Sequence, residues 1–145
     1  MSIQLINGGN HIDDRGEIQF VNEFTFPDVK RFYIIKPKFN QVRAWQGHRR
    51  EHKYFFVSHG SFLVCTVRID DWGNPSPDLK VNATILTEEQ PTILAVPSGH
   101  VNGFKSLQEN STLIVFSNLS LEDSLKDDFR FDKTLWFDWD EDKNR

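Results

Sequence analysis

The sequence has little cysteine, no long apolar run and a small net charge. Its one cysteine, Cys65, cannot form a disulfide within the chain, and its place in the apolar segment SFLVCTV predicts a small buried residue. No apolar run approaches the roughly 20 residues that a membrane helix needs. The N-terminus, MSIQLINGGN, lacks the basic and apolar regions of a signal peptide. These absences predict a cytoplasmic protein with no membrane partner.

The size and charge of the chain set further bounds. With 145 residues, the chain is expected to form a single domain, 1–145, with a real core. The net charge of -4 disfavours non-specific binding to nucleic acid, although it is compatible with a local basic pocket for a phosphate. Aromatic residues, mostly Phe, are plentiful while Ala and Leu are modest, which disfavours helix-rich folds.

Short strands separated by turns dominate the pattern. Alternation and strand-forming residues predict strands over 17–24, 31–35, 43–48, 53–57, 61–67, 79–86, 92–96, 104–107 and 112–116. The residues Ser58-His59-Gly60 between two of these strands indicate a hairpin. Such a series of strands in one domain predicts an all-β sandwich or barrel.

The pattern changes at Ser120, which is expected to cap one or two turns of helix. The C-terminal tail that follows is charged but carries large aromatic residues, which are costly to leave in water. We therefore expect the tail to pack back on the body or onto a second subunit. The aromatic residues of the tail are Phe129, Phe131, Trp136, Phe137 and Trp139.

The stretch from Arg43 to Gly60, RAWQGHRREHKYFFVSHG, concentrates cations, histidines and an amide beside an apolar strand. Such groups on a rigid sheet could form a site for a small, negatively charged molecule. A solvated charged strand next to a core strand would give the same pattern, so the residues of this stretch alone leave both interpretations open.

Several motifs taken together resemble a known family. They are Asp14-Arg15-Gly16, Arg31-Phe32-Tyr33, the stretch from Arg43 to Gly60, Pro97-Ser98-Gly99 with Gly103-Phe104, and the aromatic tail. From about Asp13 to Trp139 the chain resembles the cupin nucleotide-sugar enzymes, namely the dTDP-4-dehydrorhamnose 3,5-epimerases and the related dTDP-sugar 3,4-ketoisomerases. The resemblance implies a double-stranded β-helix (cupin jelly roll) with a short helical or irregular C-terminal tail, assembled as a homodimer.

The family patterns match this sequence in part. The epimerase pattern R-G-x-H with a later lysine falls on Arg43, Ala44, Gln46 and Lys53, and the second histidine of the ketoisomerase pattern R-G-x-H-x-H-K falls on His48. In the pattern P-x-G-x-x-H-G-F, Asn102 occupies the place of the histidine. In the epimerases, a tyrosine that acts as the acid is expected on the segment 112–116. This sequence has no tyrosine there.

The reaction implied by the resemblance needs a base for a C–H beside a ketone, a cation near the enolate oxygen and a group that returns the proton. His48 is the candidate base, because an unperturbed histidine titrates near ~6.5. Lys53 and Arg43 are candidates for stabilising the enolate or binding the diphosphate, and Tyr33 or His52 is a candidate for the acid. The candidate substrate-binding residues are Arg43, Gln46, Arg15, Arg31 and Asn102.

Two further questions concern metals and catalysis. The places of the usual cupin metal ligands hold Gln46, His48, Glu51 or His52, and Asn102, and amides are poor ligands, so no metal and no other cofactor is expected. The expected function is a nucleotide-sugar isomerase, either 3,5-epimerase-like or 3,4-ketoisomerase-like, in deoxysugar or surface-polysaccharide synthesis. The alternative is a non-catalytic cupin that binds a nucleotide-sugar or a glycan.

Overall fold

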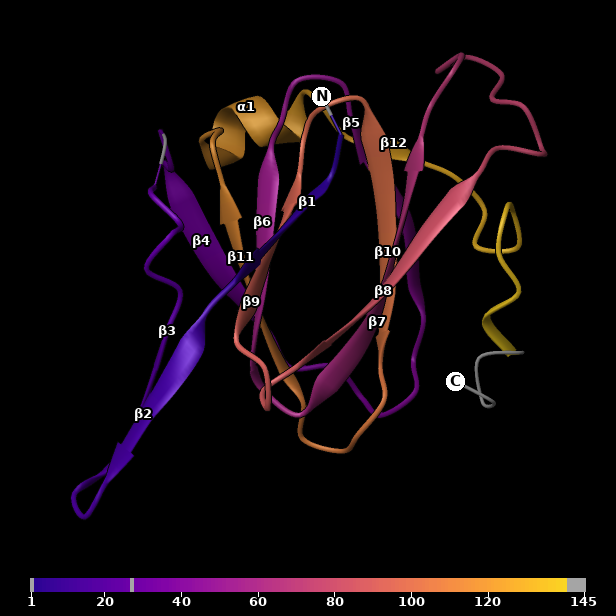
Figure 1. The fold of residues 1–145 in the computed structure, drawn as a ribbon. Helices are drawn as coiled ribbons and strands as arrows, with labels where there is room; N and C mark the ends of the chain where they lie inside the picture. The colour runs from indigo at the N-terminus through magenta and orange to yellow at the C-terminus, as the bar shows by residue number, and fades with distance from the viewer. Residues whose placement is uncertain (1, 27, 141–145) are drawn as a thin grey trace.

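The computed structural model describes residues 2–26 and 28–140, and its two main sheets are antiparallel and face each other (Figure 1). One five-stranded sheet has the order β1 (Gln4–Asn7), β9 (Thr92–Val96), β6 (Lys53–His59), β11 (Thr112–Ser117) and β4 (Arg31–Ile35). The other has the order β12 (Phe129–Arg130), β5 (Arg43–His48), β10 (His100–Ser106), β7 (Ser61–Arg68) and β8 (Val81–Thr87). The expectation of an all-β fold is confirmed.

The space between the two sheets holds the main core. Every second residue of a strand faces inward, because side chains alternate across a sheet. Phe55 and Val57 of β6 therefore meet Leu113 and Val115 of β11, and Phe62 of β7 packs in the same cluster. These side chains are at most 2% exposed, so this part of the barrel interior is tightly closed by apolar groups.

The connection at Gly60 differs from the predicted hairpin. It joins β6 of one sheet to β7 of the other, so the chain crosses the barrel instead of pairing with itself. Gly60 has a φ of 76°, a conformation that favours glycine, and a Cβ there would lie 2.1 Å from Oγ of Ser111. The turn residues therefore form a connection between the two sheets. The sequence predicts the turn but does not say which sheet the second strand joins.

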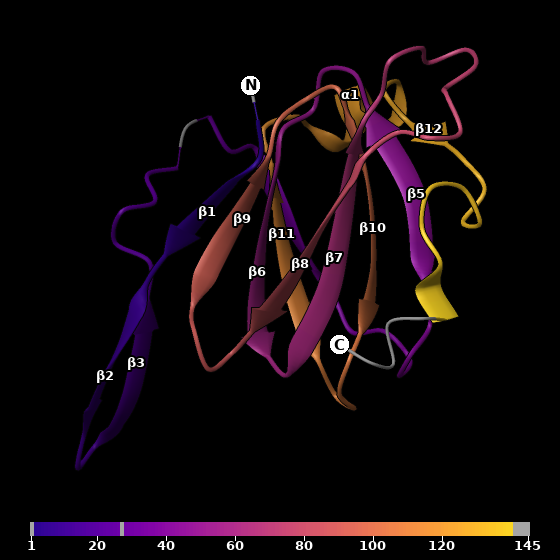
Figure 2. The ribbon, with the colours of Figure 1, turned by 45° about the vertical axis from the view of Figure 1, so that its right-hand side comes forward.

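The C-terminal tail packs against the outward face of the β12-β5-β10-β7-β8 sheet, as Figures 1 and 2 show. Trp139 and Trp45 lie there with a ring-centroid distance of 5.6 Å, and Trp45 donates through Nε1 to the carbonyl oxygen of Leu135 at 3.0 Å. The predicted packing of the tail on the body is confirmed. Cys65 is buried in the same outer layer, as its apolar segment predicts.

Two N-terminal strands were absent from the predicted set. β1 pairs with β9, whereas β2 (Gly9–Asp13) pairs with β3 (Gly16–Phe20) in a separate two-stranded sheet that projects from the barrel (Figure 1). The strand expected at 104–107 begins earlier, at His100, directly after the turn that contains Gly99.

The predicted cap at Ser120 is confirmed. Its side chain accepts a hydrogen bond from the backbone N–H of Asp123 at 3.2 Å and starts helix α1 (Leu121–Leu125). This helix lies across the end of the barrel where β5 ends and β6 begins (Figures 1 and 2). Among the described residues, no helix is long and apolar enough to cross a membrane.

Candidate active site at the mouth of the barrel

The barrel is open at the end near α1, and we call the cavity there the mouth cavity. It has a volume of about 550 Å³ and is bounded by strands β4, β5, β6 and β10 together with the start of the tail. A smaller cavity of about 230 Å³ lies beside it under α1 and shares four of its lining residues. The shared residues are Tyr33, Gln46, Lys53 and Arg130.

Lys53 is the inward-facing residue at the start of β6 and is only 3% exposed. Its Nζ donates to Oε1 of Gln46 at 3.3 Å, and Gln46 in turn donates through Nε2 to Oδ1 of Asp128 at 3.1 Å. Burial lowers the pKa of Lys53 to about 8, although the carboxylate of Glu51 opposes the shift. A lysine with this pKa can act as a cation or give up a proton near neutral pH.

Tyr33 lines both cavities from β4, where its Cα is paired with that of Val115 on β11. Burial, helped by the charge of Glu51, raises the pKa of its phenol to about 12. The side chain therefore stays protonated at neutral pH and can donate a proton or a hydrogen bond. No tyrosine lies on β11 itself, and Tyr33 on the neighbouring strand β4 is the tyrosine that lines these two cavities.

The predicted cations and amide line the mouth cavity or the smaller cavity beside it. Arg43 and Asn102 line the mouth cavity from the paired strands β5 and β10. Arg31 lines the smaller cavity, with its guanidinium carbon 5.0 Å from the centre of the Tyr33 ring and its Nη2 donating to Oγ of Ser124 at 2.9 Å. Guanidinium groups and amides in this arrangement suit a phosphate-bearing ligand.

His48 lies at the end of β5, on the same face as Gln46, and is 2% exposed. Its Nδ1 lies 2.7 Å from the carbonyl oxygen of Asp127, so Nδ1 carries the proton and Nε2 has the lone pair. Nε2 is buried with no hydrogen-bond partner among the described residues. Burial and the nearby charge of Lys53 lower the pKa of His48, which keeps the ring neutral at neutral pH. The ring is close to the mouth cavity but does not line it.

The structure also places two acidic residues beside His48: Glu51, which the sequence suggested only as a possible metal ligand, and Asp127, which sequence reasoning missed. Glu51 is buried, and its carboxylate accepts hydrogen bonds from the hydroxyls of Ser117 and Ser124, at 2.7 and 2.6 Å. The carboxylate of Asp127 accepts from three consecutive backbone N–H groups, those of residues 49, 50 and 51, each at 2.9 Å. Glu51 sits in a charged run that looks solvated, and no sequence signal pairs Asp127 with that run.

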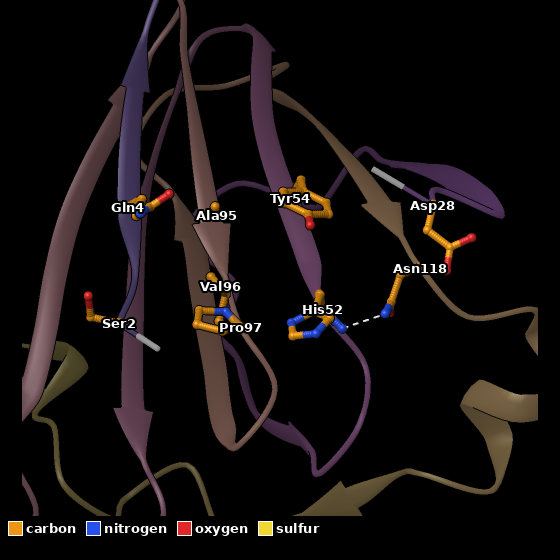
Figure 3. Close-up of a pocket in the computed structure, with 9 residues that line it drawn as sticks. All are labelled: Ser2, Gln4, Asp28, His52, Tyr54, Ala95, Val96, Pro97 and Asn118. Atoms are coloured by element: carbon orange, nitrogen blue, oxygen red, sulfur yellow. Dashed lines mark hydrogen bonds between the residues drawn. The ribbon is translucent and has the colours of Figure 1, made fainter. Parts of the chain in front are cut away.

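His52 is separated from this site. It precedes Lys53, so the two side chains point to opposite faces of the sheet. His52 lines a different cavity of about 600 Å³ on the outer surface (Figure 3). Its Nδ1 accepts from the backbone N–H of Ser98 at 3.0 Å, and its backbone N–H donates to the side chain of Asn118. Within this chain, the structure therefore does not bring His52, a candidate for the acid, to the mouth cavity.

Arg15 is also remote from the mouth cavity. It follows β2 at the tip of the β2–β3 hairpin, which points away from the α1 end of the barrel (Figures 1 and 2). Its side chain is 85% exposed and pairs with Asp13 at 2.7 Å. The predicted role in substrate binding is not supported within one chain, because the hairpin carries Arg15 to the far side of the molecule.

The site therefore combines a buried histidine with a lone pair, a buried lysine, a phenol and several cations. This set can remove a proton from carbon, stabilise the resulting negative charge and return a proton. Among residues 2–26 and 28–140, no group of three His, Cys, Asp or Glu side chains could hold a metal ion.

Similar folds occur among solved structures, although no protein-family model and no curated protein matches the sequence. The dTDP-4-dehydrorhamnose 3,5-epimerase of Sulfolobus tokodaii is 26% identical, with a TM-score of 0.78 over 96% of this chain and 81% of that one. The rmlC epimerase of Mycobacterium tuberculosis is 21% identical, with a TM-score of 0.78 over 95% and 74% of the two chains. This chain has the fold of the cupin nucleotide-sugar enzymes.

A third cupin extends the comparison to the ketoisomerases. The sugar 3,4-ketoisomerase QdtA of Thermoanaerobacterium thermosaccharolyticum, in complex with TDP, is 19% identical, with a TM-score of 0.70 over 99% of this chain and 96% of that one. The predicted double-stranded β-helix is confirmed by these cupins, and so is the resemblance inferred from the motifs. Epimerases and ketoisomerases both appear among the similar folds, so the fold is common to the two reactions.

Proposed function

We propose that this protein is a nucleotide-sugar isomerase that acts on a dTDP-4-keto-6-deoxyhexose by removing a proton next to the ketone. The observation that carries the proposal is the state of His48, a buried imidazole with its Nδ1 proton held by a carbonyl oxygen and its Nε2 lone pair unpartnered among the described residues. A buried base of this kind, close to a cavity lined by cations, is suited to an anionic substrate with an acidic C–H.

In this proposal His48 Nε2 takes the proton from the carbon, and the electrons of the broken C–H bond form the enolate. The ammonium group of Lys53 stabilises the enolate oxygen, while Arg31 and Arg43 bind the diphosphate and Asn102 binds the sugar. Nε2 is buried, so a side chain must move before the substrate reaches it; in this proposal Gln46 moves, and the substrate replaces its 3.3 Å hydrogen bond with Lys53.

The return of the proton decides between the two isomerase reactions. Epimerisation needs a donor on the opposite face of the carbon, and the phenol of Tyr33 is the candidate, because it lines the mouth cavity and stays protonated at neutral pH. Ketoisomerisation needs only one base that moves the proton between adjacent carbons. Both reactions would place the protein in cytoplasmic deoxysugar or surface-polysaccharide synthesis.

The test is proton NMR in D2O with dTDP-4-keto-6-deoxyglucose. We expect loss of the C3 signal, together with the C5 signal for an epimerase or a new C3 ketone for a ketoisomerase, and we expect His48→Ala to abolish the exchange. His59→Ala is the matched control, because His59 is 59% exposed at the other end of β6. Exchange that continues at the normal rate in His48→Ala would contradict the proposed base.

A non-catalytic cupin is the second candidate, and one observation favours it. Gln46 occupies the place of the family histidine and lines the mouth cavity with Lys53, whereas the ring of His48 does not line it. Such a cavity could hold an anionic nucleotide-sugar without chemistry. Calorimetric binding of the same compound without any hydrogen exchange would establish this second function.

The proposal includes a homodimer, because apolar side chains lie uncovered on the outward face of the β1-β9-β6-β11-β4 sheet. Phe32 and Ile34 of β4 are 62% and 51% exposed. Isolated apolar residues are ordinary on a surface, but a shared face of this kind is typical of an interface between copies. Light scattering should give twice the mass of one chain, and Phe32→Glu should reduce it to the mass of one chain.

A further inference from the structure

A single buried carboxylate connects the candidate base to the rest of the mouth. The side chain of Glu51 is 0% exposed and lies where four structural elements meet. It accepts from Ser117 of β11 and Ser124 of α1, lies 3.6 Å from Nη2 of Arg31 on β4, and lies 3.4 Å from Nδ1 of His48 on β5. A fully buried carboxylate is costly unless it is paired and hydrogen-bonded, so its position is closely determined by these contacts.

Glu51 approaches the nitrogen of His48 that carries the proton. Nδ1 of His48 faces both the carbonyl oxygen of Asp127 at 2.7 Å and Oε1 of Glu51 at 3.4 Å. Two acceptors on this side hold the proton on Nδ1 and leave Nε2 as the basic nitrogen. When Nε2 takes up a proton, the negative charge of Glu51 stabilises the imidazolium that forms.

We propose that Glu51 is the positioning residue of His48. Glu51 fixes the tautomer of the imidazole ring and stabilises its protonated form while the substrate loses a proton. This inference deepens the proposed isomerase function and rests on it. Glu51 does not touch the mouth cavity, so its effect on the substrate passes through the imidazole.

The charges around His48 have opposing effects. Lys53 on β6 disfavours the protonated ring, whereas Glu51 and Asp127 favour it, and His48 in turn acts on Asp128. Burial is the largest influence and lowers the pKa of His48. Without the charge of Glu51, only Asp127 and Asp128 oppose the effects of burial and Lys53. The pKa of His48 must therefore fall further.

The backbone around Glu51 is held by the same acidic residue that contacts His48. The carboxylate of Asp127 accepts from the N–H groups of Arg49, Arg50 and Glu51, while its carbonyl oxygen accepts from Nδ1 of His48. The turn after β5 and the segment after α1 are therefore tied together. This connection fixes the distance between the Glu51 carboxylate and the imidazole.

The experiment compares Glu51→Gln with Glu122→Gln. Both remove one negative charge, but Glu122 lies on α1 with an 82% exposed side chain that pairs only with Lys126 among the described residues. Histidine NMR, with the His48 signals assigned by their loss in His48→Asn, gives the tautomer and the pKa of the ring without any substrate. We expect the pKa of His48 to fall by about one unit in Glu51→Gln, a tenfold change in proton affinity, and to stay unchanged in Glu122→Gln.

Hydrogen exchange provides the second measurement. Glu51→Gln should slow the exchange at least about tenfold and move the acidic limb of the pH profile to lower pH, because the base is weaker. A role confined to folding would lower the melting temperature without moving that limb. If Glu51→Gln does not fold, Glu51→Asp keeps the charge but retracts it, and a smaller fall in the pKa is expected.

The two proposals fail in different ways. A wild-type protein that catalyses no exchange, but whose His48 pKa depends on Glu51, would overturn the enzyme and retain the pairing. A His48 pKa that is the same in wild type, Glu51→Gln and Glu51→Asp would overturn the positioning role, whatever the activity.

Discussion

The two ends of the barrel interior are built from the same strands but are filled with different side chains. At the mouth, β6 contributes Lys53 and β11 contributes Ser117, which are paired in register. Farther along the same strands the inward positions are Phe55 and Val57, and Val115 and Leu113. The apolar end buries surface at little cost, whereas the mouth keeps charged and polar groups out of water. The fold therefore draws stability from one end and can carry chemistry at the other.

The largest expected effect comes from breaking the apolar end. Phe62 is 0% exposed in the core between the sheets, so Phe62→Ala removes a large buried ring and leaves a cavity. We expect the free energy of unfolding to fall by about 3–5 kcal/mol, measured by urea denaturation. Phe39→Ala is the control, because Phe39 is 50% exposed and its loss should change little. Equal losses in the two variants would contradict the assignment of the core.

The opposite change sharpens the contrast at the mouth. Lys53→Met removes a buried charge whose pKa is lowered from 10.5 to about 8, so we expect a gain of about 1–3 kcal/mol at pH 7 together with loss of hydrogen exchange. Below pH 8 both folded and unfolded states carry the charge and the folded state bears its full cost. That cost disappears as pH rises from 8 to 10.5, so the gain should shrink over this range.

The control for this measurement is Lys80→Met at an exposed position, which should leave the stability unchanged. A Lys53→Met protein that is less stable than wild type at pH 7 would mean that the hydrogen bond and the contacts of Lys53 outweigh the cost of its burial.

The pH dependence of the exchange tests the mouth without a substitution. The pKa of His48 is lowered, so the neutral base persists below pH 6.5 and the acidic limb should lie below that value. Lys53 loses its charge as pH rises through about 8, so the rate should fall on that side. A profile that rises steadily through pH 8 and beyond would show that the cation of Lys53 is not required.

The smallest expected effect lies at the helix over the mouth. Ser120→Ala removes the hydroxyl that accepts from the N–H of Asp123, and we expect a loss of about 1 kcal/mol in the free energy of unfolding. Ser120→Asp keeps a capping oxygen and should restore most of that loss. Thermal unfolding of the three proteins makes the comparison. Loss in both variants to the same extent would indicate that the hydroxyl has another role.

Much of the fold could be predicted because it depends on local patterns. Alternating apolar residues predicted most of the strands, and Ser120 followed by acidic residues predicted the cap of α1. The partner of a strand is a different matter, since Gly60 gives the same turn signal whether the chain returns to its own sheet or crosses to the other. The hairpin prediction failed for that reason.

The candidate site was only partly predictable. His48, Lys53 and Arg43 lie in one stretch of sequence and meet at the mouth or beside it. Tyr33 could be included only through the family resemblance, because it comes from a strand distant in sequence. His52, the other candidate for the acid, lies next to Lys53 in the chain, but strand alternation turns its side chain to the outer surface.

The sequence alone determined that the chain is a β protein with an aromatic tail that is covered by the body or by a second subunit, because alternation and large apolar side chains act over short distances. Only the tertiary structure decided that Asp127 lies beside His48 and Glu51, since residues 76 or more positions apart along the chain meet there through hydrogen bonds. Burial also depends on all the surrounding strands. The same charged run that looks solvated in the sequence therefore supplies a carboxylate and an ammonium group to the interior of the barrel.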